Sequence, residues 1–130
     1  MEIVLTSTNA TLNVDAEGTF HLRWAPGSSV SGADADAVVA AVRSVTGGRL
    51  QPMLVEVVDV SMSFESRATL LGTRFVSAVA LVGATVVDRV MAGALLREQE
   101  CPNGYFTSVE DAREWLNRLP LTESLEESVA

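Results

Sequence analysis

The sequence predicts one α/β domain built on a single mixed β-sheet, with a leading antiparallel hairpin and β-α crossovers in the order β-β-α-β-α-β-α-β-α. Three observations favour this fold class: two alternating apolar and polar segments near the start, later apolar runs of strand length, and helical periodicity between those runs. Strands that alternate with helices favour right-handed crossovers and a largely parallel sheet. With 130 residues, we expect one domain over 1–130, with a core over about 11–119 and an acidic tail over 120–130.

The first two strands form the predicted hairpin. Apolar residues alternate with polar ones over 11–15 and again over 19–24, and the segment between them contains Gly18, which suits a tight turn. Ile3 to Leu5 is a candidate extension of this hairpin. One apolar face predicts that the hairpin is half-buried.

The first predicted helix begins at the capping pair Ser31 and Asp34 and ends at Gly47. Its expected buried residues are Ala35, Val38, Val39, Val42 and Val45. A second helix starts near Ser63, with an expected buried face of Phe64, Ala68, Leu71 and Phe75. Apolar runs over 53–58, before this helix, and 78–82, after it, predict strands that are covered on both faces.

Two more helices follow. The third opens at Thr85 and Asp88. Its expected buried residues are Val87, Val90, Met91, Ala94 and Leu95. After a short strand over 104–106, the pair Thr107 and Glu110 predicts the start of the last helix. Its apolar face consists of Ala112, Trp115, Leu116 and Leu119, and Pro120 predicts its end.

Composition narrows the classes of function. The net charge of −8 argues against a nucleic-acid partner, because binding a polyanion requires clustered basic residues. The most apolar stretch, residues 75–87, is shorter than the roughly 20 residues that span a bilayer as a helix. The N-terminus lacks the pattern of a signal peptide, and the single cysteine excludes an internal disulfide. We therefore expect a cytoplasmic protein without membrane insertion.

The residues of the common enzyme sites are missing. The sequence has no G-x-x-x-x-G-K loop and no G-x-G-x-x-G loop. His21 is the only histidine and falls on the solvent side of the hairpin, while Cys101 precedes a proline in a loop with scattered charges nearby, which favours a plain thiol over a reactive one. We expect no enzymatic activity, no cofactor and no metal site.

Glu56 interrupts an otherwise apolar strand. A buried carboxylate must pair, become protonated or face a polar crevice. One interpretation is an ion pair with an arginine such as Arg67 or Arg74, and the other is a carboxylate in a ligand pocket.

The corner that follows this strand is rich in short polar residues: Asp59, Ser61, Ser63, Glu65 and Ser66. Serine and aspartate are ordinary residues of turns and helix caps. A helix N-terminus is also a place where a phosphoryl group is stabilised. Both interpretations stay open.

Three segments carry a family resemblance: the strand over 53–58, the segment Phe64-Glu65-Ser66-Arg67-Ala68, and the ending from Gly104 through Leu116. In layout, from about residue 11 to 119, the chain resembles the STAS-type domains of bacterial anti-sigma-factor antagonists, particularly uncharacterised STAS-like proteins of actinobacteria. In the antagonists, an Asp-Ser-Ser-Gly segment at a helix N-terminus contains a serine that a partner kinase phosphorylates. The matching stretch here is Glu65-Ser66-Arg67-Ala68, which lacks the second serine and the glycine.

The resemblance implies a non-enzymatic regulatory or protein-interaction module of STAS-like fold. The candidate regulatory phosphorylation sites are Ser63 and Ser66, and the candidate interaction or pocket residues are Glu56, Asp59, Glu65 and Arg67. The alternative is a small-molecule or lipid carrier with a pocket lined by Glu56 and the second and third helices. We also expect a symmetric homodimer, because the hairpin would otherwise leave an unpaired sheet edge.

Overall fold

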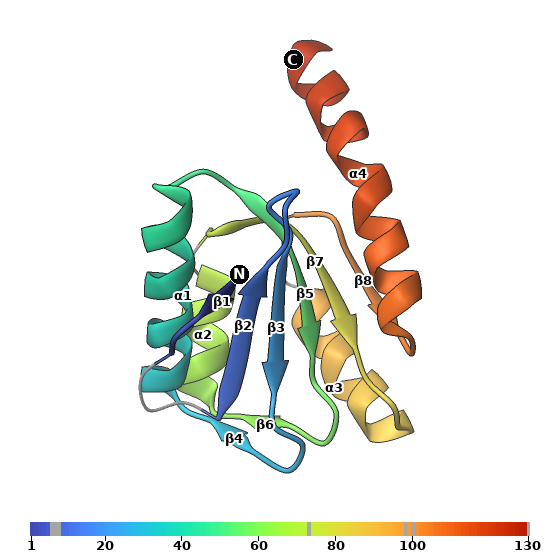
Figure 1. Ribbon diagram of the computed structural model, residues 1–130. Coiled ribbons are helices and arrows are strands. Elements are labelled where there is room, and N and C mark those ends of the chain that lie inside the picture. Colours follow the sequence, from blue (N-terminus) through green and yellow to red (C-terminus); the bar gives the residue numbers. More distant parts are fainter. Residues whose placement is uncertain (6–8, 73, 98, 100, 130) are drawn as a thin grey trace.

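A six-stranded sheet with the order β1-β2-β3-β5-β7-β8 forms the centre of the molecule in the computed structural model (Figure 1). The structure describes residues 1–5, 9–72, 74–97, 99 and 101–129, with side chains for all of these except 71, 72 and 120–129. The strands of the sheet are β1 Glu2–Ile3, β2 Ala10–Val14, β3 Phe20–Trp24, β5 Gln51–Glu56, β7 Val76–Val82 and β8 Asn103–Phe106.

The pairing confirms the predicted mixed sheet. β1, β2 and β3 pair antiparallel, whereas β3, β5, β7 and β8 pair parallel. Two short strands that the sequence did not predict, β4 (Ser29–Val30) and β6 (Ser61–Met62), form a separate parallel pair. This pair connects the segment that precedes the first helix to the segment that precedes the second helix.

The outer edge of the hairpin is paired within the chain. Ile3 of β1 lies opposite Leu12 of β2, and the backbone of Met1 exchanges hydrogen bonds with Val14 in both directions, at 2.8 and 2.9 Å. The unpaired edge that favoured a dimer is therefore covered over this stretch by the start of the chain.

Four helices flank the sheet: α1 Gly32–Thr46, α2 Phe64–Gly72, α3 Val86–Leu96 and α4 Val109–Val129. Side chains of α1, α2 and α3 contribute to one core with Phe20, Leu22 and Trp24 of β3. Helix α4 covers the other face over β5, β7 and β8, and it extends beyond the body of the molecule (Figure 1). The part of this second face over β2 and β3 is not covered by α4.

Three of the four predicted helix starts are confirmed, including that of α2, which begins at Phe64 directly after Ser63. Ser31 with Asp34, and Thr85 with Asp88, form complete capping boxes. The start of α4 is one residue later than predicted, because the hydroxyl of Ser108, not Thr107, accepts the N–H of Asp111. The predicted stop at Pro120 is also wrong, since α4 runs to Val129. A proline removes only one helix hydrogen bond, so it does not always end a helix.

The buried faces of the helices differ from the prediction. In α2, Phe64 is 77% exposed and Ala68 is exposed, while Ser66 is fully buried. The predicted member Leu71 lies outside the described side chains. In α1, Val45 is exposed and Thr46 is buried in its place.

Helix α3 is rotated relative to the predicted face. Val87 and Val90 are 76% and 69% exposed, and Ala94 is also exposed. The buried residues are Asp88, Ala92 and Leu95, at spacing i, i+4, i+7. Because the Asp88 carboxylate turns inward to bind backbone N–H groups, the valines beside it turn outward.

Among the described residues, no helix is both long enough and apolar enough to cross a membrane.

Candidate functional site

The corner between β5 and α2 lies beside the start of α3. Both helices begin at the carboxyl ends of neighbouring parallel strands, which is where open α/β sheets place their functional crevice. One carboxylate connects the two starts. Asp88 accepts the N–H of Asp59 at 3.0 Å, and also the N–H groups of Ala84 and Thr85 at 2.9 and 3.0 Å.

These hydrogen bonds determine the charge state of Asp88. Burial of the side chain, which is 2% exposed, raises the pKa of the carboxyl. The backbone N–H groups of Ala84, Asp59 and Thr85 and the Thr85 side chain act against burial, and together they lower the pKa below its ordinary value. Asp88 is therefore ionised at neutral pH and holds two loops together.

Tyr105 of β8 packs beside Gly83, next to Asp88. A Cβ atom on Gly83 would lie 2.5 Å from the Tyr105 hydroxyl and 2.7 Å from the Asp88 Cβ, so this position requires glycine. The hydroxyl is buried and has no hydrogen-bond partner among the described residues. Burial, followed by the charge of Asp88, raises the pKa of Tyr105, while the charge of Arg89 lowers it.

Four large apolar side chains are exposed on these two helix starts. They are Phe64 on α2 and Val86, Val87 and Val90 on α3, each at least 69% exposed. We call these four residues the edge surface. Both helices begin at the carboxyl end of the parallel strands, so these exposed apolar residues lie at the same end of the sheet and form a candidate interaction surface.

The two candidate serines are in different environments. Ser63 is exposed, and its hydroxyl accepts the N–H of Ser66 at 3.0 Å, so Ser63 caps α2. The hydroxyl of Ser66 is fully buried and donates to the backbone oxygen of Ser63 at 2.9 Å.

The other corner residues lie at the surface. Asp59, Glu65 and Arg67 are all exposed. Asp59 has a φ of 52°, in the left-handed region, and its backbone oxygen accepts the N–H of Gly27 at 2.8 Å. Aspartate tolerates this conformation better than most residues do.

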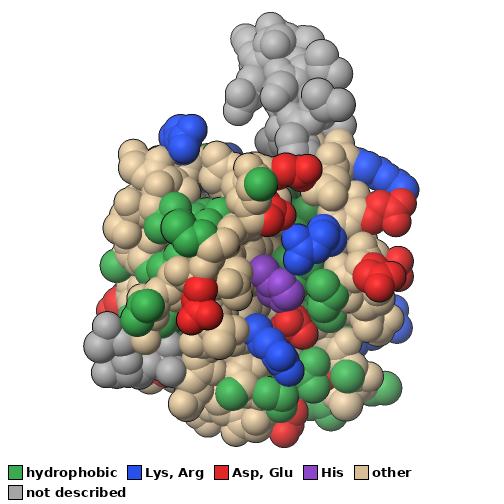
Figure 2. Space-filling view, viewed as in Figure 1, with side chains coloured by type: hydrophobic (Ala, Val, Ile, Leu, Met, Phe, Trp, Pro, Cys, Tyr) green, Lys and Arg blue, Asp and Glu red, His purple; other side chains and the backbone are tan. Residues whose placement is uncertain are grey.

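Glu56 lies on the other face of the sheet from the α2 core, and its predicted pairing with Arg67 or Arg74 is wrong. Its Oε2 atom lies 2.7 Å from Nε2 of His21 on the neighbouring strand β3. The reason is the strand register, which places residues 21 and 23 of β3 and residue 56 of β5 on the same face. Figure 2 shows the histidine between acidic and basic side chains.

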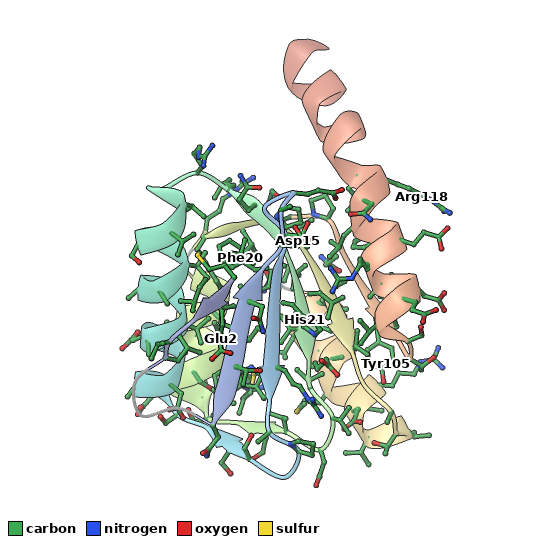
Figure 3. The ribbon with its side chains drawn as sticks, in the orientation of Figure 1. Glu2, Asp15, Phe20, His21, Tyr105 and Arg118 are labelled. Carbon is green, nitrogen blue, oxygen red and sulfur yellow. The ribbon has the colours of Figure 1, made fainter. Side chains whose placement is uncertain are left out.

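An arginine of α4 joins the pair of His21 and Glu56. Arg113 lies 3.4 Å from Nδ1 of His21 through Nη2, and it forms an ion pair with Asp15 at 3.2 Å. Figure 3 shows Asp15 at the hairpin turn and His21 on β3. Both ring nitrogens of His21 are therefore engaged, one as a donor to Glu56 and one as an acceptor from Arg113. This arrangement connects α4 to the sheet.

A cavity of about 90 Å³ lies between the sheet and helices α2 and α3. Leu70 of α2 and Leu95 of α3 line it, as expected for the carrier alternative, but Glu56 does not. That part of the expectation is wrong, because Glu56 lies on the face that α4 covers.

Sequence reasoning missed the exposed valines of α3 and the role of Arg113. Val87 and Val90 were expected on the buried face, and Val86 was not considered. The available signal was the capping pair Thr85 and Asp88, since a capping side chain defines which side of the first turn faces the preceding loop.

The protein has an α/β domain with the SpoIIAA-like, or STAS-like, fold. A solved structure with this fold is that of an uncharacterized protein from the DUF3478 family of Shewanella loihica PV-4. It matches with a TM-score of 0.63 and 13% identity, over 89% of this chain and 98% of that chain. The predicted resemblance is thus confirmed at the level of the fold.

The chain belongs to the family described as a domain of unknown function (DUF7793), whose model matches residues 13–120. Comparison with curated proteins finds no match.

Proposed function

We propose that the protein is a non-enzymatic regulatory module that binds a protein partner through the edge surface. The observation that carries the proposal is the exposure of Phe64, which is 77% exposed directly after the capping residue Ser63. This position directly precedes the stretch from Glu65 to Ala68, which resembles the regulated segment of the antagonists. A location in the cytoplasm belongs to the same proposal.

The chemistry of the edge surface supports a partner with an apolar patch. Burial of each fully exposed valine or phenylalanine side chain contributes about 1.5–3 kcal/mol. Asp59, Glu65, Arg67 and Arg89, close to the apolar residues in sequence, are exposed and carry charges of both signs. An apolar centre with a charged rim is the usual anatomy of a protein interface.

The non-enzymatic part of the proposal is supported by His21. Its two ring nitrogens are occupied by Glu56 and Arg113, so the histidine acts as a connection between α4 and the sheet.

Capture of the partner from host lysate tests the proposal. We expect wild-type protein to retain one partner that Phe64→Ser and Val87→Ser lose at least tenfold. Val4→Ser is the matched control, because Val4 is 84% exposed on another part of the surface. Equal recovery by all four proteins, or loss caused equally by Val4→Ser, would refute the edge surface as the interface.

Phosphorylation of Ser63 is proposed as the switch, with Asp59, Glu65 and Arg67 as its charged surroundings. Ser63 is the exposed serine of the pair, and Arg67 follows it by one helical turn. A phosphate adds up to about two negative charges beside the apolar edge surface. We expect Ser63→Asp to weaken binding of the captured partner at least fivefold and Ser63→Ala to leave it unchanged.

Ser66 provides the comparison for this experiment. Because its hydroxyl is buried, Ser66→Asp should lower the thermal unfolding temperature, whereas Ser63→Asp should not. If Ser63→Asp binds the partner like wild type, the switch is refuted while the interface proposal stands.

A second copy of the chain is also a proposed partner, which would give a symmetric dimer. The hairpin edge is paired by β1, so the dimer would use the exposed valines of α3. Light scattering should then give twice the mass of the 13.8 kDa chain for wild type and the single mass for Val90→Ser. A wild-type monomer at all concentrations would exclude this version.

A further inference from the structure

The cavity under α2 and α3 has the features of a small-molecule site that is separate from the edge surface. None of Phe64, Val86, Val87 and Val90 lines it. Its wall combines side chains from the sheet, including Trp24 of β3, with Leu70 of α2 and Leu95 of α3. The inference therefore does not depend on the proposed partner.

The volume of the cavity limits the apolar part of the ligand. A dry cavity of about 150 Å³ with a similar lining holds benzene. One water molecule takes up roughly 30 Å³ in the liquid, and we use this volume for each heavy atom of a ligand. The cavity of about 90 Å³ in this protein therefore holds about three heavy atoms. The cavity of about 90 Å³ thus fits an isopropyl group and is too small for a long acyl chain.

The charged residue on the wall of the cavity indicates what the polar part of the ligand should be. Arg74 is the single charged residue among the described residues that line the cavity, and its side chain is exposed, so it lies where the cavity meets solvent. Within the described part of the chain, Arg74 has no carboxylate partner. A guanidinium with no partner binds a carboxylate through paired charge-assisted hydrogen bonds.

We propose that this cavity binds a short branched-chain carboxylate of the size of isobutyrate. The isopropyl group lies among Trp24, Leu70 and Leu95, and the carboxylate pairs with Arg74. Burial of the apolar group and the ion pair at the mouth act together, so neither a short acid without the branched group nor a neutral analogue should bind as well.

NMR titration of the isotope-labelled protein tests the site. The indole N–H of Trp24 gives its own resonance, and it is buried without a hydrogen-bond partner among the described residues. We expect isobutyrate to cause saturable shifts of this resonance and of the Leu70 and Leu95 amides. Acetate, which lacks the branched group, and isobutyramide, which lacks the charge, should bind at least tenfold more weakly.

Two arginine variants provide the decisive comparison. Arg74→Gln should weaken isobutyrate binding at least tenfold and leave isobutyramide unchanged. Arg67→Gln removes an exposed arginine of α2 that does not line the cavity, and it should bind isobutyrate like wild type. The absence of saturable shifts, or equal weakening by both variants, would overturn the proposal. Tighter binding of decanoate than of isobutyrate would also overturn it, and would favour a lipid carrier.

Discussion

Replacement of Asp88 by alanine is expected to lower the free energy of unfolding by about 3 kcal/mol, because three partly buried backbone N–H groups lose their acceptor. These are the N–H groups of Asp59, Ala84 and Thr85. Urea unfolding at pH 7, followed by circular dichroism, measures this loss.

Asp34→Ala is the matched control for that experiment. Asp34 occupies the same third position of a capping box at the start of α1, but its hydrogen bonds are exposed to solvent. Its removal should cost about 1 kcal/mol, the usual value of an exposed cap. Equal losses for the two variants would mean that Asp88 is an ordinary cap and that the connection to Asp59 contributes nothing.

The contribution of Asp88 should also depend on pH. The pKa of this carboxyl is lower in the folded protein than in the unfolded chain. Its stabilisation is therefore complete above about pH 4 and is lost as the pH falls further through the folded pKa. Asp88→Asn, which cannot ionise, should flatten this part of the curve of unfolding free energy against pH. An unchanged acid limb in Asp88→Asn would contradict the assignment.

Gly83→Ala is expected to be similarly damaging, with a loss of about 2–3 kcal/mol through overpacking. The new methyl group would lie 2.5 Å from the Tyr105 hydroxyl and 2.7 Å from the Asp88 Cβ. Tyr105→Phe removes the first of these contacts, and it also removes a buried hydroxyl that has no partner among the described residues. It should therefore be nearly neutral alone and restore about 1 kcal/mol in the double variant.

Gly93→Ala makes the same chemical change within α3 and should have the opposite effect. A Cβ atom at Gly93 meets nothing within 4 Å, so the better helix propensity of alanine should stabilise the protein by about 1 kcal/mol. If Gly83→Ala were as well tolerated as Gly93→Ala in thermal unfolding, the close packing of Tyr105 against Gly83 would be wrong.

The sheet could be predicted from the sequence because its signals are local. Alternation defines the hairpin from Ala10 to Trp24, and a continuous apolar run defines β7, which is buried on both faces. Capping boxes defined the starts of α1 and α3 for the same reason, since the cap and its partner are three residues apart.

The candidate site could be predicted only as a region, because the contacts that build it are distant in sequence. Glu56 and His21 are 35 residues apart, and their pairing follows from the order and register of β3 and β5. The faces of α2 and α3 were wrong for a related reason. An apolar stripe does not by itself identify the buried face of a helix, because apolar side chains such as Phe64 and Val87 can also be exposed.

Hydrogen–deuterium exchange of the protein with its captured partner tests the central claim most directly. We expect protection of backbone amides at 59–67 and 84–90, the two helix starts that carry the edge surface. We expect no change in β3 around His21 or in α4 around Arg113. Protection of these parts of β3 and α4, with residues 59–67 and 84–90 unchanged, would contradict the proposed interface.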